Sequence, residues 1–255
     1  MPWAGLRLAV TLLTAIPLPG RLAEPSRRTA AAAMYWAPVV GAGAGAISAG
    51  VLALAVRTGH TGPLLAAALA IGTGAVVTRA LHLDGLADFA DGLGSGQDAD
   101  GALAIMRRSD IGPFGVVTLV LMLLIQVAAL SRAQALGRGP EAIVTAAVTA
   151  RLAMTVACRR PVPAARPGGL GALVAGSVRP AGAAVLVLVA VAAAAGAGLA
   201  LGSSLYLAAG LVAGLLVSVA LTALATRRLG GVTGDVLGAL AEVAGTVCLL
   251  VTALS

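Results

Sequence analysis

The sequence predicts an all-α, polytopic membrane protein with about seven transmembrane helices and a short interfacial helix at its N-terminus. Of its 255 residues, 59% are hydrophobic and only 11% are charged, whereas about 25% charged residues is typical of a soluble domain. The mean hydropathy is +1.00, and the apolar residues form runs of the ~20 residues that cross a bilayer. We therefore expect residues 1–255 to form a single integral membrane domain.

Seven apolar runs are the candidates for crossing helices. Six of them are long, and they cover residues 34–56, 64–81, 111–136, 181–201, 205–225 and 236–254. The seventh, 142–157, is shorter and contains Arg151. Residues 3–17 are expected to form the short interfacial or re-entrant helix, because Arg7 interrupts their apolar run. The 34 glycines suit close packing between helices in lipid.

The basic residues predict the orientation of these helices. All of them are arginines, and the net charge is +7. With seven spans, most arginines fall on the side of the N-terminus, and they are Arg7, Arg21, Arg27, Arg28, Arg107, Arg108, Arg159, Arg160, Arg166, Arg179, Arg227 and Arg228. Only Arg57, Arg132 and Arg138 fall toward the other side. Because cytoplasmic loops carry the excess of basic residues, we expect a cytoplasmic N-terminus in the inner membrane.

Composition also limits the partners. The arginines are not interleaved with aromatic residues, so nucleic-acid binding is not expected. The two cysteines, Cys158 and Cys248, lie far apart without the spacing of a zinc site or a disulfide framework. The lipid bilayer is the expected environment.

An acidic motif is the first candidate for chemistry, since six of the seven aspartates lie between residues 84 and 110. If the helix of the second span runs on through this stretch, Asp84, Asp88 and Asp91 share one stripe roughly 60° wide. Like charges on one face repel, and a cation removes that penalty. Carboxylate oxygens suit Mg²⁺ or Mn²⁺. The alternative is an acidic solvated loop. His82, just ahead, could act as a base or could only pack or cap.

A glycine-rich motif at 227–238 is the second candidate. Gly231, Thr233 and Gly234 precede a helix expected to begin near Asp235, and such a helix N-terminus can bind a phosphate. Arg227 could clamp phosphoryl oxygens. The alternative is an ordinary loop with a helix cap and arginines that only set topology.

A third polar segment, 106–115, lies between these motifs in the sequence. Arg107 and Arg108 could hold a pyrophosphate, whereas Ser109 or Asp110 could simply cap the helix that follows. All three segments fall on the predicted cytoplasmic side. Carboxylates for a metal, arginines and a glycine-rich loop on one side are what phosphoryl transfer needs.

At these residues the chain resembles the cobalamin synthase family, whose activity is that of adenosylcobinamide-GDP ribazoletransferase. The similar stretches are HLDGLAD (82–88) with DG (91–92), DIGPFG (110–115), GGVTGD (230–235), TAIPLP (14–19) and ARPGGLG (165–171). Ala15 stands where the family often has an arginine. In order and spacing, the likeness runs along nearly the whole chain.

The resemblance implies a Mg²⁺-dependent transferase whose active site faces the cytoplasm. It would join adenosylcobinamide-GDP to α-ribazole or its 5′-phosphate and release GMP, and it is compatible with a homo-oligomer. Asp84 and Asp88 would be the first metal ligands, and Asp91 a ligand or general base. Asp235 would be a ligand or orienting group of the second motif. The candidate diphosphate contacts are Arg79, Arg107 and Arg108.

Two other functions are considered. A CDP-alcohol phosphotransferase acting on lipid also uses Asp-Gly and spaced aspartates, but its later aspartates lie further from the first Asp-Gly than Asp88 and Asp91 do here. A small-solute transporter would carry ionisable groups at the middle of its spans. The predicted spans hold few polar groups, with Arg151 and Gln126 the most visible, which favours an enzyme.

Overall fold

A computed structural model describes residues 2–19, 26–59, 61–202 and 205–254. Within these ranges every regular element is a helix and there is no strand, which confirms the all-α fold class. The helices are α1 (Pro2–Leu13), α2 (Arg27–Arg57), α3 (Pro63–Val77), α4 (Leu81–Gly94), α5 (Ala99–Ile105), α6 (Pro113–Ala135), α7 (Gly139–Ala157), α8 (Gly169–Val174), α9 (Pro180–Ala200), α10 (Tyr206–Leu229) and α11 (Gly234–Thr252).

Six helices are long and apolar enough to cross a membrane, namely α2, α6, α7, α9, α10 and α11. The bent pair α3 and α4 gives a seventh if the two helices count as one span. The six to seven spans confirm the expected number of about seven, and the short N-terminal helix is α1. The weakest predicted span, 142–157, is the central helix α7, which packs against α2, α10 and α11. Its central place explains its lower hydropathy, because protein and not lipid surrounds Arg151.

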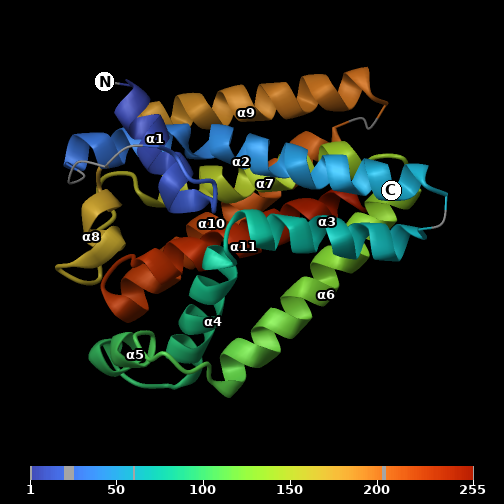
Figure 1. The fold of residues 1–255 in the computed structure, drawn as a ribbon. Coiled ribbons are helices and arrows are strands. Elements are labelled where there is room, and N and C mark those ends of the chain that lie inside the picture. The colour runs from blue at the N-terminus through green and yellow to red at the C-terminus, as the bar shows by residue number, and fades with distance from the viewer. Residues whose placement is uncertain (1, 20–25, 60, 203–204, 255) are drawn as a thin grey trace.

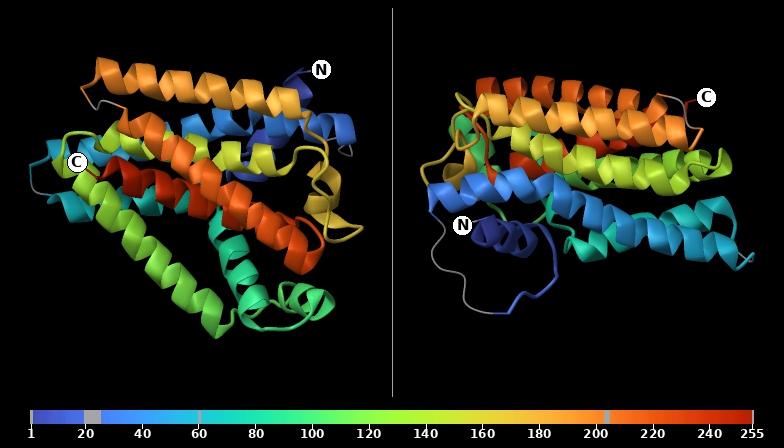
Figure 2. Two further views of the ribbon diagram at one scale, coloured as in Figure 1. Left: turned by 180° about the vertical axis from the view of Figure 1, so that it is seen from behind. Right: turned by 90° about the horizontal axis from the view of Figure 1, so that it is seen from above.

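The helices form a bundle in which α2, α3, α7, α9, α10 and α11 run side by side, as Figure 1 shows. The short helices α5 and α8 lie at the end where α2 and α11 begin, and the C-terminus lies at the opposite end (Figures 1 and 2). We call the first end the polar end, and it is formed by residues 26–30, 78–112, 158–180 and 227–235. It holds most of the arginines, although Arg21 lies outside the described residues.

The expectation that the second span's helix runs on through the acidic motif is wrong. Helix α3 stops at Val77, and α4 leaves it at an angle of 89°. Arg79 and Ala80 cause the break, because both adopt left-handed backbone angles, with φ of 53° and 54°. The Ala80 N–H bonds to the Ala75 carbonyl and closes the turn. The acidic motif is therefore a separate helix, α4, that runs at nearly a right angle to α3 at the polar end.

Candidate active site

The site is built where α4 crosses α11, and two glycines make this crossing close. A Cβ added to Gly85 would lie 2.8 Å from the carbonyl oxygen of Asp235 and 2.9 Å from its Cα. A Cβ added to Gly238 would lie 3.1 Å from the carbonyl oxygen of His82. The two backbones therefore touch. This contact brings the acidic motif beside Asp235, about 150 residues away in the sequence.

The carboxylates of Asp84, Asp88 and Asp235 gather at this crossing. Asp84 is exposed, and the other two are half-buried. The pKa of Asp88 is raised to about 6, first by burial and then by the negative charges of Asp84, Asp235 and Asp91. Such crowding of like charges is a cost that a bound cation would remove. The i, i+4, i+7 spacing predicted for the acidic motif is kept, since α4 covers all three of its aspartates.

Asp91 has a structural partner that its spacing did not reveal. Its carboxylate accepts hydrogen bonds from the backbone N–H groups of Gly112, at 2.7 Å, and Gly115, at 2.9 Å. These are unpaired donors at the start of α6, and the Asp91 side chain is buried against them. Asp91 therefore fixes the start of α6 to α4. This contact explains why the 110–115 motif accompanies the acidic motif.

His82 lies on the buried side of α4, with only 1% of its surface exposed. Neither ring nitrogen has a hydrogen-bond partner among the described residues. Its backbone packs on Gly238 of α11. This placement agrees with the packing role and keeps the imidazole away from the exposed carboxylate of Asp84.

The glycine-rich motif forms both a helix cap and a wall of the site. The Thr233 hydroxyl accepts a hydrogen bond from the N–H of Val236 and donates one to Asp235, at 3.1 and 3.2 Å. The alternative of an ordinary helix cap is thus correct for Thr233. Gly231 has a packing role, because an added Cβ would meet the Pro163 carbonyl and lie 2.7 Å from the carbonyl carbon of Ala164.

Arg166 is the site residue that the sequence reasoning missed. Its Nη2 lies 3.7 Å from the Asp235 Oδ2 and donates to the Leu103 carbonyl at 3.2 Å. Burial lowers the pKa of Arg166, and the negative charge of Asp235 acts against this. The only signal was the 165–171 stretch, which was noted for its family likeness but given no role.

A cavity of about 170 Å³ opens beside Arg166. Its other walls are Gly168–Ala172 and Val232–Asp235, so it includes Thr233 and Gly234. A guanidinium, a helix N-terminus and a glycine-rich loop therefore surround one small volume. This combination suits an anionic group such as phosphate.

The other predicted arginines divide into two groups. Arg107 and its exposed neighbour Arg108 lie on the loop after α5, and Arg107 is close enough to Arg166 for their charges to interact. Arg79 instead turns to α1, where its Nη2 donates to the Thr11 carbonyl at 3.4 Å. Arg227 is exposed in the last turn of α10. Among the described residues, neither Arg79 nor Arg227 makes a hydrogen bond or ion pair with a carboxylate of the site.

No three histidine, cysteine or acidic side chains in the described ranges are already grouped as a metal site. The predicted ligands Asp84, Asp88 and Asp235 are neighbours, but they do not converge on one point. Asp91 directs its carboxylate to the start of α6. The metal assignment therefore stays a prediction.

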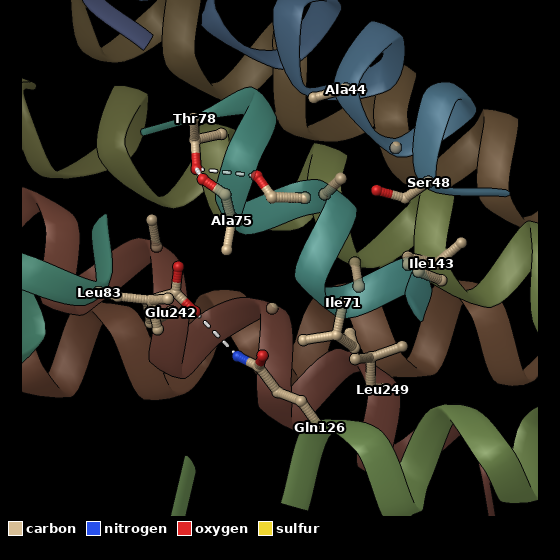
Figure 3. A pocket seen from close by; sticks show the side chains of 18 of the residues that line it. Ala44, Ser48, Ile71, Ala75, Thr78, Leu83, Gln126, Ile143, Glu242 and Leu249 are labelled. Atoms are coloured by element: carbon tan, nitrogen blue, oxygen red, sulfur yellow. Dashed lines mark hydrogen bonds between the residues drawn. The ribbon is translucent and has the colours of Figure 1, made fainter. Parts of the chain in front are cut away.

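A second polar cluster lies inside the bundle around a cavity of about 100 Å³. Figure 3 shows the Gln126 amide facing the Glu242 carboxylate, to which it donates at 2.8 Å. The same amide group contacts the Thr246 hydroxyl at 2.9 Å. Arg151 lines the cavity across from Glu242. Gln126, Glu242 and Thr246 thus partner one another, as buried polar groups in a membrane do, whereas the buried Arg151 Nε has no hydrogen-bond partner among the described residues.

Comparison with known proteins shows the family of the chain. The family model described as cobalamin-5-phosphate synthase matches residues 5–253. A protein of Frankia casuarinae is 44% identical over 98% of this chain and 94% of its own length. One of Chlorobium phaeobacteroides is 38% identical over 93% and 92%, and one of a Nocardioides species is 40% identical over 96% of both chains.

Each of these three relatives is named adenosylcobinamide-GDP ribazoletransferase. No solved structure matches the chain. The family resemblance read from the motifs is confirmed, and so is the expectation of a membrane-bound transferase. The two other functions considered for the sequence are set aside. With a match along nearly its whole length, the chain belongs to the cobalamin-5-phosphate synthase family.

Proposed function

We propose that this protein joins adenosylcobinamide-GDP to α-ribazole or α-ribazole 5′-phosphate and releases GMP, at the crossing of α4 and α11. The observation that carries the proposal is the meeting of Asp84, Asp88 and Asp235 beside Arg166 and its small cavity. The names of the relatives supply the substrate class. The arginines of the cluster can bind a diphosphate, and its carboxylates can bind the metal ion that accompanies one.

The proposed reaction is one displacement at phosphorus. A ribose hydroxyl oxygen of α-ribazole bonds to the phosphorus nearer the cobinamide. The bond from that phosphorus to the bridging oxygen breaks, and GMP leaves with this oxygen. The hydroxyl proton passes to a carboxylate of the cluster. Arg166 and Arg107 hold the phosphoryl oxygens, since guanidinium groups match them with paired N–H donors.

The carboxylates suit a magnesium or manganese ion by their chemistry. Asp84, Asp88 and Asp235 would hold it, because they offer oxygen ligands only and their charges crowd one another. A bound Mg²⁺ would neutralise the diphosphate charge that develops during transfer. We assign Asp91 to positioning, through α6, and His82 to packing between α4 and α11.

We also propose that the site faces the cytoplasm at the inner membrane. The arginines of the polar end support this orientation, since basic residues concentrate in cytoplasmic loops. Cysteines introduced as Gln97→Cys and Pro167→Cys should react with an impermeant reagent only from the cytoplasmic side. Thr61→Cys, at the opposite end, should react only from outside. Reaction of Gln97→Cys and Pro167→Cys from different sides would contradict the shared site.

The activity is tested with purified protein in detergent, adenosylcobinamide-GDP and Mg²⁺. We expect GMP release that depends on α-ribazole or α-ribazole 5′-phosphate, and the two acceptors compared at equal concentration reveal the preferred form. Chelation with EDTA should stop the reaction, and added Mg²⁺ or Mn²⁺ should restore it. Folded protein that releases no GMP with either acceptor would refute the proposal. Full turnover after verified metal removal would refute the metal assignment alone.

A further inference from the structure

A second cavity lies at the polar end, lined by the start of α2 and by the loop that follows α8. Its volume is about 840 Å³. The two cavities share no lining residue, because Gly169–Ala172 face the first and Gly176–Ser177 face the second. The second cavity is therefore distinct from the cavity of the site proposed above.

Four arginines make this cavity strongly positive. They are Arg27 and Arg28 at the start of α2, Arg160, and Arg179 just before α9, and no acidic residue is among the described residues that line it. Both α2 and α9 begin here, so two helix N-termini add their positive ends to the guanidinium charges. The described part of the cavity therefore carries a charge that only an anion would offset.

Two of the arginines are held in place by the loop before α9. Arg27 donates from Nη2 to the Ala175 carbonyl at 2.8 Å, and Arg160 from Nε to the Gly176 carbonyl at 3.2 Å. The guanidinium groups of Arg28 and Arg179 make no hydrogen bond to the described residues. The cavity thus combines two fixed guanidinium groups with two that are available to a ligand.

Two further polar groups stand on the cavity wall. The Ser177 side-chain oxygen is buried and has no hydrogen-bond partner among the described residues. The Tyr35 hydroxyl accepts the backbone N–H of Arg179 at 3.0 Å, which joins α2 to the start of α9. Tyr35 is the only aromatic residue of the described lining, so the charge of the arginines dominates the wall.

We propose that this four-arginine cavity binds a phosphate group, carried either by an anionic phospholipid or by a soluble phosphate. Guanidinium groups offer paired N–H donors that match phosphate oxygens, and Ser177 adds a hydroxyl donor. Basic pockets between membrane helices bind lipid phosphates in the same way. Both sources share this chemistry, and binding experiments separate them.

The test uses lipid-stripped protein in neutral detergent and two probes. Phosphatidylglycerol binding is counted by native mass spectrometry against phosphatidylcholine, and inorganic phosphate binding is measured by equilibrium dialysis. The double variant Arg28→Gln/Arg179→Gln removes only the two available guanidinium groups. The matched control, Arg57→Gln/Arg132→Gln, removes the same charge at the opposite end of the bundle.

We expect saturable binding of at least one probe, weakened by about tenfold or more in the first double variant and unchanged in the control. A loss confined to phosphatidylglycerol identifies a lipid headgroup, and a loss of phosphate binding identifies a soluble ligand. The single variant Arg28→Gln should show part of the loss if the double variant is unstable. Equal affinities in both double variants, or no saturable binding of either probe, would overturn the proposal.

Discussion

The close crossing of α4 and α11 depends on Gly85, so Gly85→Ala tests the site through one added carbon. The new Cβ would lie 2.8 Å from the carbonyl oxygen of Asp235, whereas ordinary contacts begin at 3.4 Å. Both neighbours are backbone, so no side chain can turn away. The helices must separate by about 0.6 Å, which moves Asp84 and Asp88 away from Asp235.

The size of the effect follows from this displacement. Overpacking of a close contact costs about 1–3 kcal/mol of stability. A misplacement approaching 1 Å between catalytic groups can lower a rate by about 10²-fold. We therefore expect Gly85→Ala to insert and fold with a lower unfolding temperature, and its turnover to fall on the order of 10²-fold.

The assay is GMP release at equal membrane abundance, with the unfolding temperature measured on the same samples. Gly43→Ala is the matched control, because a Cβ added at Gly43 of α2 meets nothing within 4 Å. It should keep full activity and gain up to about 1 kcal/mol of stability, since alanine favours the helix. A wild-type rate in Gly85→Ala would refute the dependence of the site on this helix crossing.

Three other substitutions separate the roles of the site residues. Asp88→Asn should lower turnover by orders of magnitude at unchanged stability, as loss of a metal ligand does. The control Asp100→Asn, on the exposed side of α5, should keep the wild-type turnover. Equal turnover in the two variants would contradict the ligand role of Asp88. Arg166→Gln should weaken the apparent affinity for adenosylcobinamide-GDP by about tenfold or more, which a substrate titration measures. Asp91→Asn can satisfy only one of its two N–H donors, so it should lose about 1–3 kcal/mol in thermal unfolding, whereas unchanged stability would refute its role in holding α6.

The sequence was sufficient for the long apolar helices, because in lipid the length of each apolar run is set by the bilayer. It was not sufficient for the break after α3, because neither glycine nor proline marks it. Arg79 and Ala80 adopt a left-handed conformation that such residues rarely take. Tertiary contacts of α4 with α6 and α11 hold this turn, and the spacing of apolar residues in the sequence does not reveal such contacts.

The site was predicted in its residue types and only partly in its roles. Asp84, Asp88 and Asp235 do meet, as expected from the motifs. The roles of Asp91 and Arg166 depend on partners 24 and 69 residues away, Gly115 and Asp235. Local spacing cannot reveal such partners. The spacing suggested a metal ligand or a base at Asp91 and did not reveal its contact with the start of α6.

The 89° turn of α4 also determines at what depth the acidic stripe lies. On a straight continuation of α3, the seven steps from Asp84 to Asp91 would rise by about 10 Å along the axis of α3. On the turned helix the same residues extend at nearly a right angle to that axis, so the three aspartates lie at a similar level of the bundle. A diphosphate that binds along α4 would then stay at the polar end. The reaction proposed here would need no path for its reactants between the crossing helices.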